Sequence, residues 1–195
     1  MNSQLSRRRF LKAVIASSVA AASCSGMHSA IAPGRLRGTV ERLISLNING
    51  ATRRVDVSPQ ETLAHTLRYK LGLTGTKIGC NRGECGTCTV LIDGVTVYAC
   101  SMLTQSVRSR AVRTIEGLQA NDGTLHPVQQ AFIDELSPQC GFCTPGQIMS
   151  TVALLEENPT PTREEARQAL SGNLCRCGAY DHYLNGVMRA SGQSS

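Results

Sequence analysis

The spacing of eight cysteines is the feature that most constrains how this chain of 195 residues can fold. The first group follows the pattern C-x4-C-x2-C-x11-C, and the second has a C-x2-C pair and a C-x-C pair with 31 residues between them. The eight residues are Cys80, Cys85, Cys88, Cys100, Cys140, Cys143, Cys175 and Cys177. A ninth cysteine, Cys24, lies in the N-terminal segment. Close spacings of this kind favour metal binding over a disulfide framework.

The first group predicts a 2Fe–2S cluster. Its first three cysteines have the spacing of the plant-type ferredoxin loop. Glycines at 79, 83 and 86 allow that loop to turn inward tightly, so that backbone amides can point at the sulfurs. Cys100 follows an expected strand and is the predicted fourth ligand.

The second group predicts another metal site, placed between helices. Cys175 and Cys177 are too close to share one helical face, so they belong to a turn. Pro145 and Gly178 mark helix boundaries beside the two pairs. Two cysteine pairs at helix ends can meet at one site, where a 2Fe–2S cluster is again expected.

Zinc and disulfides are the alternatives for these cysteines. Structural zinc usually uses C-x2-C knuckles, which the C-x4-C-x2-C and C-x-C spacings fit poorly. Disulfides suit smaller secreted domains than this one.

Residues 1–37 resemble a twin-arginine export signal. Ser6-Arg7-Arg8-Arg9-Phe10-Leu11-Lys12 precedes a short Ala-rich apolar stretch that is too short and too weak to span a membrane stably. The alternatives are a disordered basic tail and, around Ala22-Ser23-Cys24, a lipoprotein site. Because this route carries folded proteins, clusters could be assembled before export, and a periplasmic location is expected.

The net charge of +6 does not indicate nucleic-acid binding. Residues 1–37 hold six basic and no acidic side chains, so the rest of the chain has equal numbers of each. A nucleic-acid surface needs basic residues clustered on a folded face.

The pattern of apolar residues predicts an α+β domain over residues 38–116. Alternation over 40–48, the turn Asn49-Gly50 and the return strand through Val57 form a hairpin, and a second hairpin turns at Asp93-Gly94. A helix is expected to begin at Ser58, and 111–115 is expected as a last strand.

Residues 117–195 are expected to be helical. Helices should begin at His126-Pro127, at Thr144-Pro145 and at the capping box Thr162–Glu165, and a last helix should run from Asp181 to Ala190. Four short helices indicate a bundle.

Three motifs together resemble the iron–sulfur subunits of molybdenum hydroxylases, the xanthine oxidase and aldehyde oxidoreductase family. They are the Cys80–Cys100 loop, the stretch Gln139-Cys-Gly-Phe-Cys-Thr-Pro-Gly146, and Gly172-Asn-Leu-Cys-Arg-Cys-Gly178. With the export signal, the chain is most similar to the iron–sulfur subunit of a periplasmic aldehyde oxidoreductase.

The resemblance implies a β-grasp ferredoxin domain followed by a four-helix bundle. It implies a large partner subunit that carries molybdopterin, as the cytosine dinucleotide, and an FAD-binding partner. Aldehydes would be oxidised to carboxylic acids in the large subunit, and electrons would pass through this chain to FAD or another acceptor. Gln139 and Cys177 would lie against the pterin, and no residue of this chain is expected to do substrate chemistry.

Other functions remain open at this point. The partner enzyme could hydroxylate isoquinoline-type N-heterocycles instead of aldehydes. The chain could also be a free-standing 2Fe–2S electron carrier or a structural zinc-binding adaptor. The helical half favours the subunit, since a free ferredoxin needs only the first domain.

Overall fold

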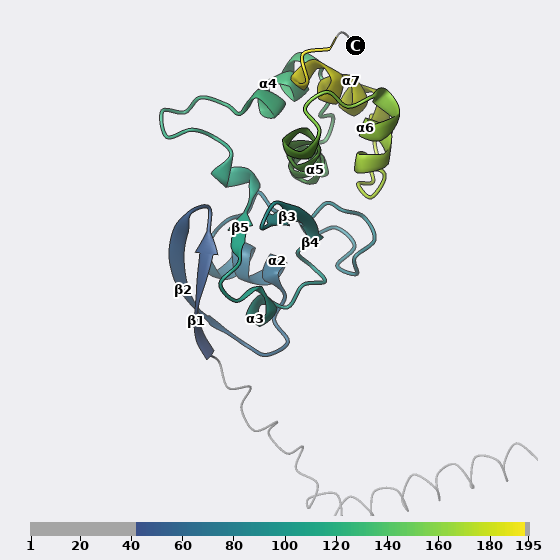
Figure 1. Ribbon diagram of the computed structural model, residues 1–195. Coiled ribbons are helices and arrows are strands. Elements are labelled where there is room, and N and C mark those ends of the chain that lie inside the picture. Colours follow the sequence, from purple (N-terminus) through teal and green to yellow (C-terminus); the bar gives the residue numbers. More distant parts are fainter. Residues whose placement is uncertain (1–41, 194–195) are drawn as a thin grey trace, which may run out of the picture. The chain divides into compact units, whose positions relative to one another are not determined.

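The computed structural model describes residues 42–193 (Figure 1). The predicted export signal and Cys24 lie outside the described residues. The described chain has a sheet-containing half followed by a helical half, and the predicted α+β fold is confirmed. The predicted division between residues 116 and 117 stays a prediction.

Five strands form one mixed sheet in the order β2-β1-β5-β3-β4. The strands are β1 (Arg42–Ile48), β2 (Ala51–Val57), β3 (Thr89–Ile92), β4 (Val95–Tyr98) and β5 (Ala111–Arg113). The hairpins β1–β2 and β3–β4 are antiparallel, whereas β1 pairs with β5 in parallel. The predicted turns are confirmed: Asn49 and Asp93 have positive φ, and each is followed by a glycine that also has positive φ. Type I′ turns need this geometry at both central residues.

The first helix begins later than the predicted start at Ser58. Helix α2 (Leu63–His65) has Thr62 as its N-cap and continues into the π-helical turn η2 (Thr66–Lys70). The prediction was wrong because Thr62 is extended and forms a β-bridge with Leu103, although Ser58 N does donate to the Glu61 carboxylate at 3.4 Å. Glu61 accepts from Thr66 Oγ1 and pairs with Lys70 at 2.8 Å, and Ser58 belongs to a turn before the helix.

The helical half consists of α4 (Pro127–Asp134), α5 (Thr144–Glu157), α6 (Arg163–Leu170) and α7 (Tyr180–Ala190). Two short elements, α3 (Thr104–Val107) and η3 (Ile115–Gly117), flank β5 in the chain. The capping box of Thr162 and Glu165 is confirmed, and α4 has a second capping box in which His126 accepts from Val128 N. The apolar stripes of α4, α5, α6 and α7 form one core.

Strand β3 joins the two halves because all four of its residues are buried. Side chains alternate across a strand, so β3 has two apolar faces. Val90 and Ile92 belong to the core of the sheet, whereas Leu91 belongs to the core of the helices. Helix α5 packs against β3 and β4 at this place.

Among residues 42–193, none of the helices has both the length and the apolar character that crossing a membrane requires.

Candidate metal centres

The first cysteine group lies on the loop between η2 and β3 and on the turn after β4. Cys80 and Cys85 are partly exposed, whereas Cys88 and Cys100 are buried. Gly83 and Gly86 have positive φ, as the predicted inward turn requires. Gly86 is also needed for close approach, since a Cβ there would lie 2.2 Å from the Gly172 carbonyl oxygen.

Backbone amides of this loop point at the cysteine sulfurs. Each of the four sulfurs accepts at least one N–H, at 3.3–3.5 Å. The donor and acceptor pairs are Arg82 and Glu84 to Cys80, Cys80 to Cys85, Cys100 to Cys88, and Gly83 to Cys100. Thiolates that bind iron carry negative charge, and amide donors stabilise that charge. The loop therefore fits the anionic cluster that its spacing predicts.

The thiol pKa values differ strongly within this group. The backbone amides of Arg82 and Glu84 lower the pKa of Cys80 to about 6. Burial raises the pKa of Cys88 to about 12, so a metal must displace its proton when it binds.

The second group combines two structural elements. Cys140 and Cys143 precede or cap the start of α5, and Cys175 and Cys177 lie in the turn between α6 and α7. The Phe142 amide and then the nearby Cys177 side chain lower the pKa of Cys140, and the nearby Cys175 side chain adds to the burial that raises the pKa of Cys143. Cys140, Cys143 and Cys175 line one cavity, so the two sequence pairs lie near each other, and their binding of one cluster stays a prediction. A 2Fe–2S cluster takes two protein ligands on each of its two irons, so two facing pairs fit it.

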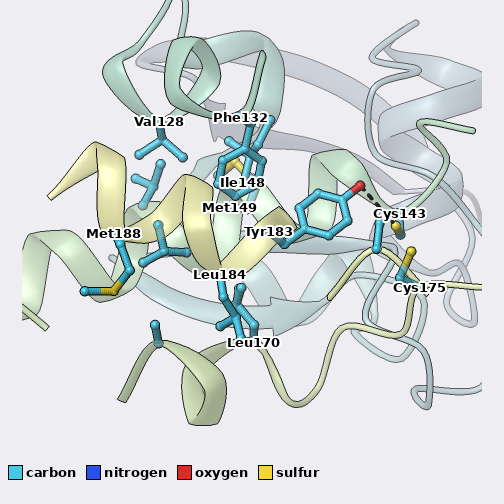
Figure 2. Packing of buried hydrophobic residues seen from close by; sticks show 14 of the residues in the cluster. Val128, Phe132, Cys143, Ile148, Met149, Leu170, Cys175, Tyr183, Leu184 and Met188 are labelled. Atoms are coloured by element: carbon cyan, nitrogen blue, oxygen red, sulfur yellow. Dashed lines mark hydrogen bonds between the residues drawn. The ribbon is translucent and has the colours of Figure 1, made fainter. Parts of the chain in front are cut away.

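The two facing pairs of cysteines differ in their exposure to solvent. Cys143 and Cys175 are buried, whereas Cys140 and Cys177 are exposed. Burial raises the pKa of Cys143 to about 11, even though the Tyr183 hydroxyl at 3.5 Å lowers it (Figure 2). The site therefore has one water-excluded edge and one edge open to solvent or to a partner.

A single cavity of 770 Å³ is lined by cysteines of both groups. Cys80 and Cys85 line it from one group, and Cys140, Cys143 and Cys175 line it from the other. Leu174 N donates to the Cys85 carbonyl oxygen at 2.9 Å, and Leu174 is bonded to Cys175. A path from Cys85 to Cys175 therefore runs through the backbone and crosses a single hydrogen bond.

Asn173 fixes this arrangement and is a residue that sequence reasoning missed. It is 3% exposed, its Nδ2 donates to Gly86 O at 2.9 Å and to Thr89 Oγ1 at 3.2 Å, and it accepts from Ser150 Oγ at 2.7 Å. Tyr98 OH also donates across the two halves, to Gly172 O at 2.9 Å. The sequence offered one signal for Asn173: it is a polar residue within the motif Gly172-Asn-Leu-Cys175.

The structure places the remaining candidate residues as follows. Gln139 is exposed beside Cys140, and its role toward a pterin stays a prediction. His126 caps α4, and His182 Nδ1 lies 3.2 Å from Glu135 O. In the described part of the chain, no three His, Cys, Asp or Glu side chains converge closely enough to hold one single metal ion.

Two family models match adjacent parts of the chain. The 2Fe-2S iron-sulfur cluster binding domain matches residues 46–114, and the [2Fe-2S] binding domain matches residues 114–188. Each matched range contains one of the two cysteine groups.

Curated relatives and a solved structure agree with this match. The nicotine 6-hydroxylase small subunit of Paenarthrobacter nicotinovorans is 49% identical over 77% of this chain and 90% of its own length. The aldehyde oxidoreductase iron-sulfur-binding subunit of Escherichia coli K12 is 39% identical over 97% of this chain and 89% of its own length. A chain of quinoline 2-oxidoreductase from Pseudomonas putida 86 has a TM-score of 0.75 and 41% identity, over 77% of this chain and 93% of that one. This protein therefore belongs to the family of small 2Fe–2S subunits of molybdenum hydroxylases.

Proposed function

We propose that the eight cysteines hold two 2Fe–2S clusters that relay electrons away from a molybdopterin-binding partner subunit. Cys80, Cys85, Cys88 and Cys100 would hold one cluster, here called the loop cluster. Cys140, Cys143, Cys175 and Cys177 would hold the other, here called the helical cluster. Each 2Fe–2S cluster, when bound, takes up and releases one electron at a time. The observation that carries the proposal is the cavity shared by both groups, together with the Leu174–Cys85 hydrogen bond.

The chain's own residues would support this relay in two ways. The loop amides stabilise thiolate charge at the loop cluster, as do their counterparts in other iron–sulfur proteins. Leu174 and Asn173 hold the two ligand sets at a fixed distance, because their hydrogen bonds join the turn before Cys175 to the Cys85–Thr89 segment.

The metal content of the purified native complex tests this assignment. We expect about four iron atoms and four acid-labile sulfides per chain, as two 2Fe–2S clusters require. Cys85→Ser and Cys143→Ser should each remove one paramagnetic signal of the reduced protein and leave the other. Stoichiometric zinc without sulfide would refute the proposal, and a monomer without molybdenum would refute the subunit role.

We propose an aldehyde as the substrate of the assembled enzyme, with the cytosine dinucleotide of molybdopterin in the large subunit and FAD in a further partner. The aldehyde oxidoreductase subunit supports this, since its similarity extends over 97% of this chain. An N-heterocycle is the second candidate, because the relative named for nicotine has the higher identity, 49%. Assays of the complex with aldehydes and N-heterocycles, using one electron acceptor, separate the two.

We also propose that residues 1–37 direct export of the folded, cluster-loaded protein to the periplasm. The arginine motif and the Ala-rich stretch behind it support this proposal. Replacement of Arg7 and Arg8 by Lys tests it, since the folded, cluster-loaded complex should then stay in the cytoplasm.

A further inference from the structure

The hydroxyl of Tyr183 is placed directly at a cysteine of the second group. Tyr183 lies on α7 and is 1% exposed, and its hydroxyl oxygen is 3.5 Å from Cys143 Sγ (Figure 2). The same oxygen is 2.7 Å from Thr144 Oγ1. Both hydroxyls therefore lie in a short chain that ends at the sulfur.

The direction of this chain follows from the chemistry of the sulfur. An iron-bound cysteine is a thiolate, which has no proton and can only accept. The arrangement that gives this thiolate a donor has Tyr183 donating to Cys143 Sγ, which leaves the Tyr183 oxygen free to accept from Thr144 Oγ1. This single arrangement satisfies both hydroxyls and the sulfur.

Packing holds the Tyr183 ring in the required place. The ring of Phe132 meets it edge-on, with centroids 5.4 Å apart and planes at 60°. Phe132 can lie there because Gly186 has no side chain: a Cβ at Gly186 would lie 2.6 Å from Phe132 Cδ1. Ser137 Oγ also donates to His182 O at 2.8 Å, which ties the segment after α4 to the start of α7. Tyr183 is therefore a fixed donor.

We propose that Tyr183 is a positioning residue that raises the reduction potential of the helical cluster through this O–H···S hydrogen bond. The inference rests on the proposed assignment of Cys143 as a ligand. Reduction adds one electron, which substrate oxidation in the partner subunit supplies, and part of the added charge resides on the ligand sulfurs. A hydrogen-bond donor stabilises the reduced form more than the oxidised form, so the cluster accepts an electron more readily. Tyr183 keeps its proton throughout.

Burial of the Tyr183 hydroxyl is the reason that its removal should change the potential of the helical cluster. Cys143 is 6% exposed and Tyr183 is 1% exposed, so water has little access to replace the donor. Ser101 offers a contrast at the loop cluster. Its hydroxyl lies 3.7 Å from Cys100 Sγ, but Ser101 is exposed and water can take its place.

Redox titration of the purified complex carrying Tyr183→Phe tests the proposal. This variant removes the hydroxyl and keeps the ring. We expect the equilibrium constant for reducing the helical cluster to fall roughly three- to tenfold, from the net strength of one hydrogen bond. A tenfold fall corresponds to a downward shift of about 59 mV for one electron. The loop cluster should keep its potential.

Tyr98→Phe is the matched control, since it removes another inter-segment tyrosine hydroxyl that donates to a backbone carbonyl. It should leave the potential of the helical cluster unchanged. Equal shifts in the two variants would show that the effect is structural and would overturn the proposal. If Tyr183→Phe does not retain its cluster, Thr144→Val decides, because it removes the hydroxyl that supports the Tyr183 oxygen. A smaller downward shift of the helical cluster supports the proposal, and no shift overturns it.

The failure of the ligand assignment can be told apart from the failure of this inference. If Cys143→Ser removes no cluster signal, the assignment itself is wrong. If both cluster signals persist in Tyr183→Phe at full intensity and unchanged potential, only the role of Tyr183 is refuted.

Discussion

Replacing Asn173 by alanine is expected to weaken the contact between the two cysteine-bearing segments. The Asn173 side chain is buried and takes part in three hydrogen bonds, to Gly86 O, Thr89 Oγ1 and Ser150 Oγ. Gly86 O keeps other donors, because Thr89 N and Thr89 Oγ1 also donate to it. Ser150, which is 5% exposed, loses its acceptor in the variant.

The magnitude follows from these contacts. Three buried hydrogen bonds at about 0.5–1.5 kcal/mol each sum to a loss of about 1.5–4.5 kcal/mol in the free energy of unfolding. For a chain of this size, each kcal/mol lowers Tm by about 2–4 °C, so the fall in Tm should be roughly 3–18 °C.

The assay is the thermal loss of cluster absorbance in the purified complex, at one scan rate for all variants. Gln130→Ala is the control, since it removes one exposed hydrogen bond to Asp134 and should change Tm far less. If Asn173→Ala and Gln130→Ala show the same Tm, the buried contacts of Asn173 do not hold the segments together.

Three further predictions concern the cofactor contact, the pH dependence and export. Gln139→Ala should lose a hydrogen bond to the pterin worth about 0.5–1.5 kcal/mol and slow cluster reduction by substrate in rapid-freeze experiments, with both clusters intact. Unchanged reduction rates and full molybdenum content would show that Gln139 is only a surface residue. Burial, followed by the charge of Arg113, lowers the pKa of His126 below its ordinary 6.5. The folded state therefore favours the neutral ring, whose Nδ1 accepts from Val128 N. The unfolded chain then binds the proton first as pH falls, and stability should decrease from about pH 6.5 downward. His126→Asn, which keeps a cap acceptor, should flatten that part of the stability curve, and an equally steep curve would rule out His126 as its source. Replacing Arg7 and Arg8 by Lys should leave folded, cluster-loaded complex in the cytoplasm, and continued export in cell fractionation would show that the signal lies elsewhere.

Features that depend on neighbouring residues were predictable from the sequence. The Asn49-Gly50 and Asp93-Gly94 turns need positive φ, which these residues accept, and the structure has it. The capping box of Thr162 and Glu165 closes within four residues, so local chemistry alone determines it.

Features that depend on distant parts of the chain were not predictable. Ser58 and Glu61 fitted a helix start locally. Far along the chain, however, Leu103 forms a β-bridge with Thr62 and Thr104 N donates to Glu61 O, and these contacts keep the segment extended. Tyr183 has the spacing of a core residue on an amphipathic helix, and nothing in that spacing indicates that its hydroxyl reaches Cys143. Contacts between residues far apart in sequence are set by packing, which a residue pattern does not record.

The two-sided burial of β3 has a consequence for how the protein unfolds. Leu91 completes the core of the helices while Val90 and Ile92 complete the core of the sheet, so separating the halves exposes apolar surface on both. Local opening of either half is therefore penalised by the other, and amide hydrogens of β3 should exchange only with the most global unfolding events. An isolated helical half would lack Leu91 and would have to cover that part of its core with another apolar side chain, which limits its use as an interchangeable module.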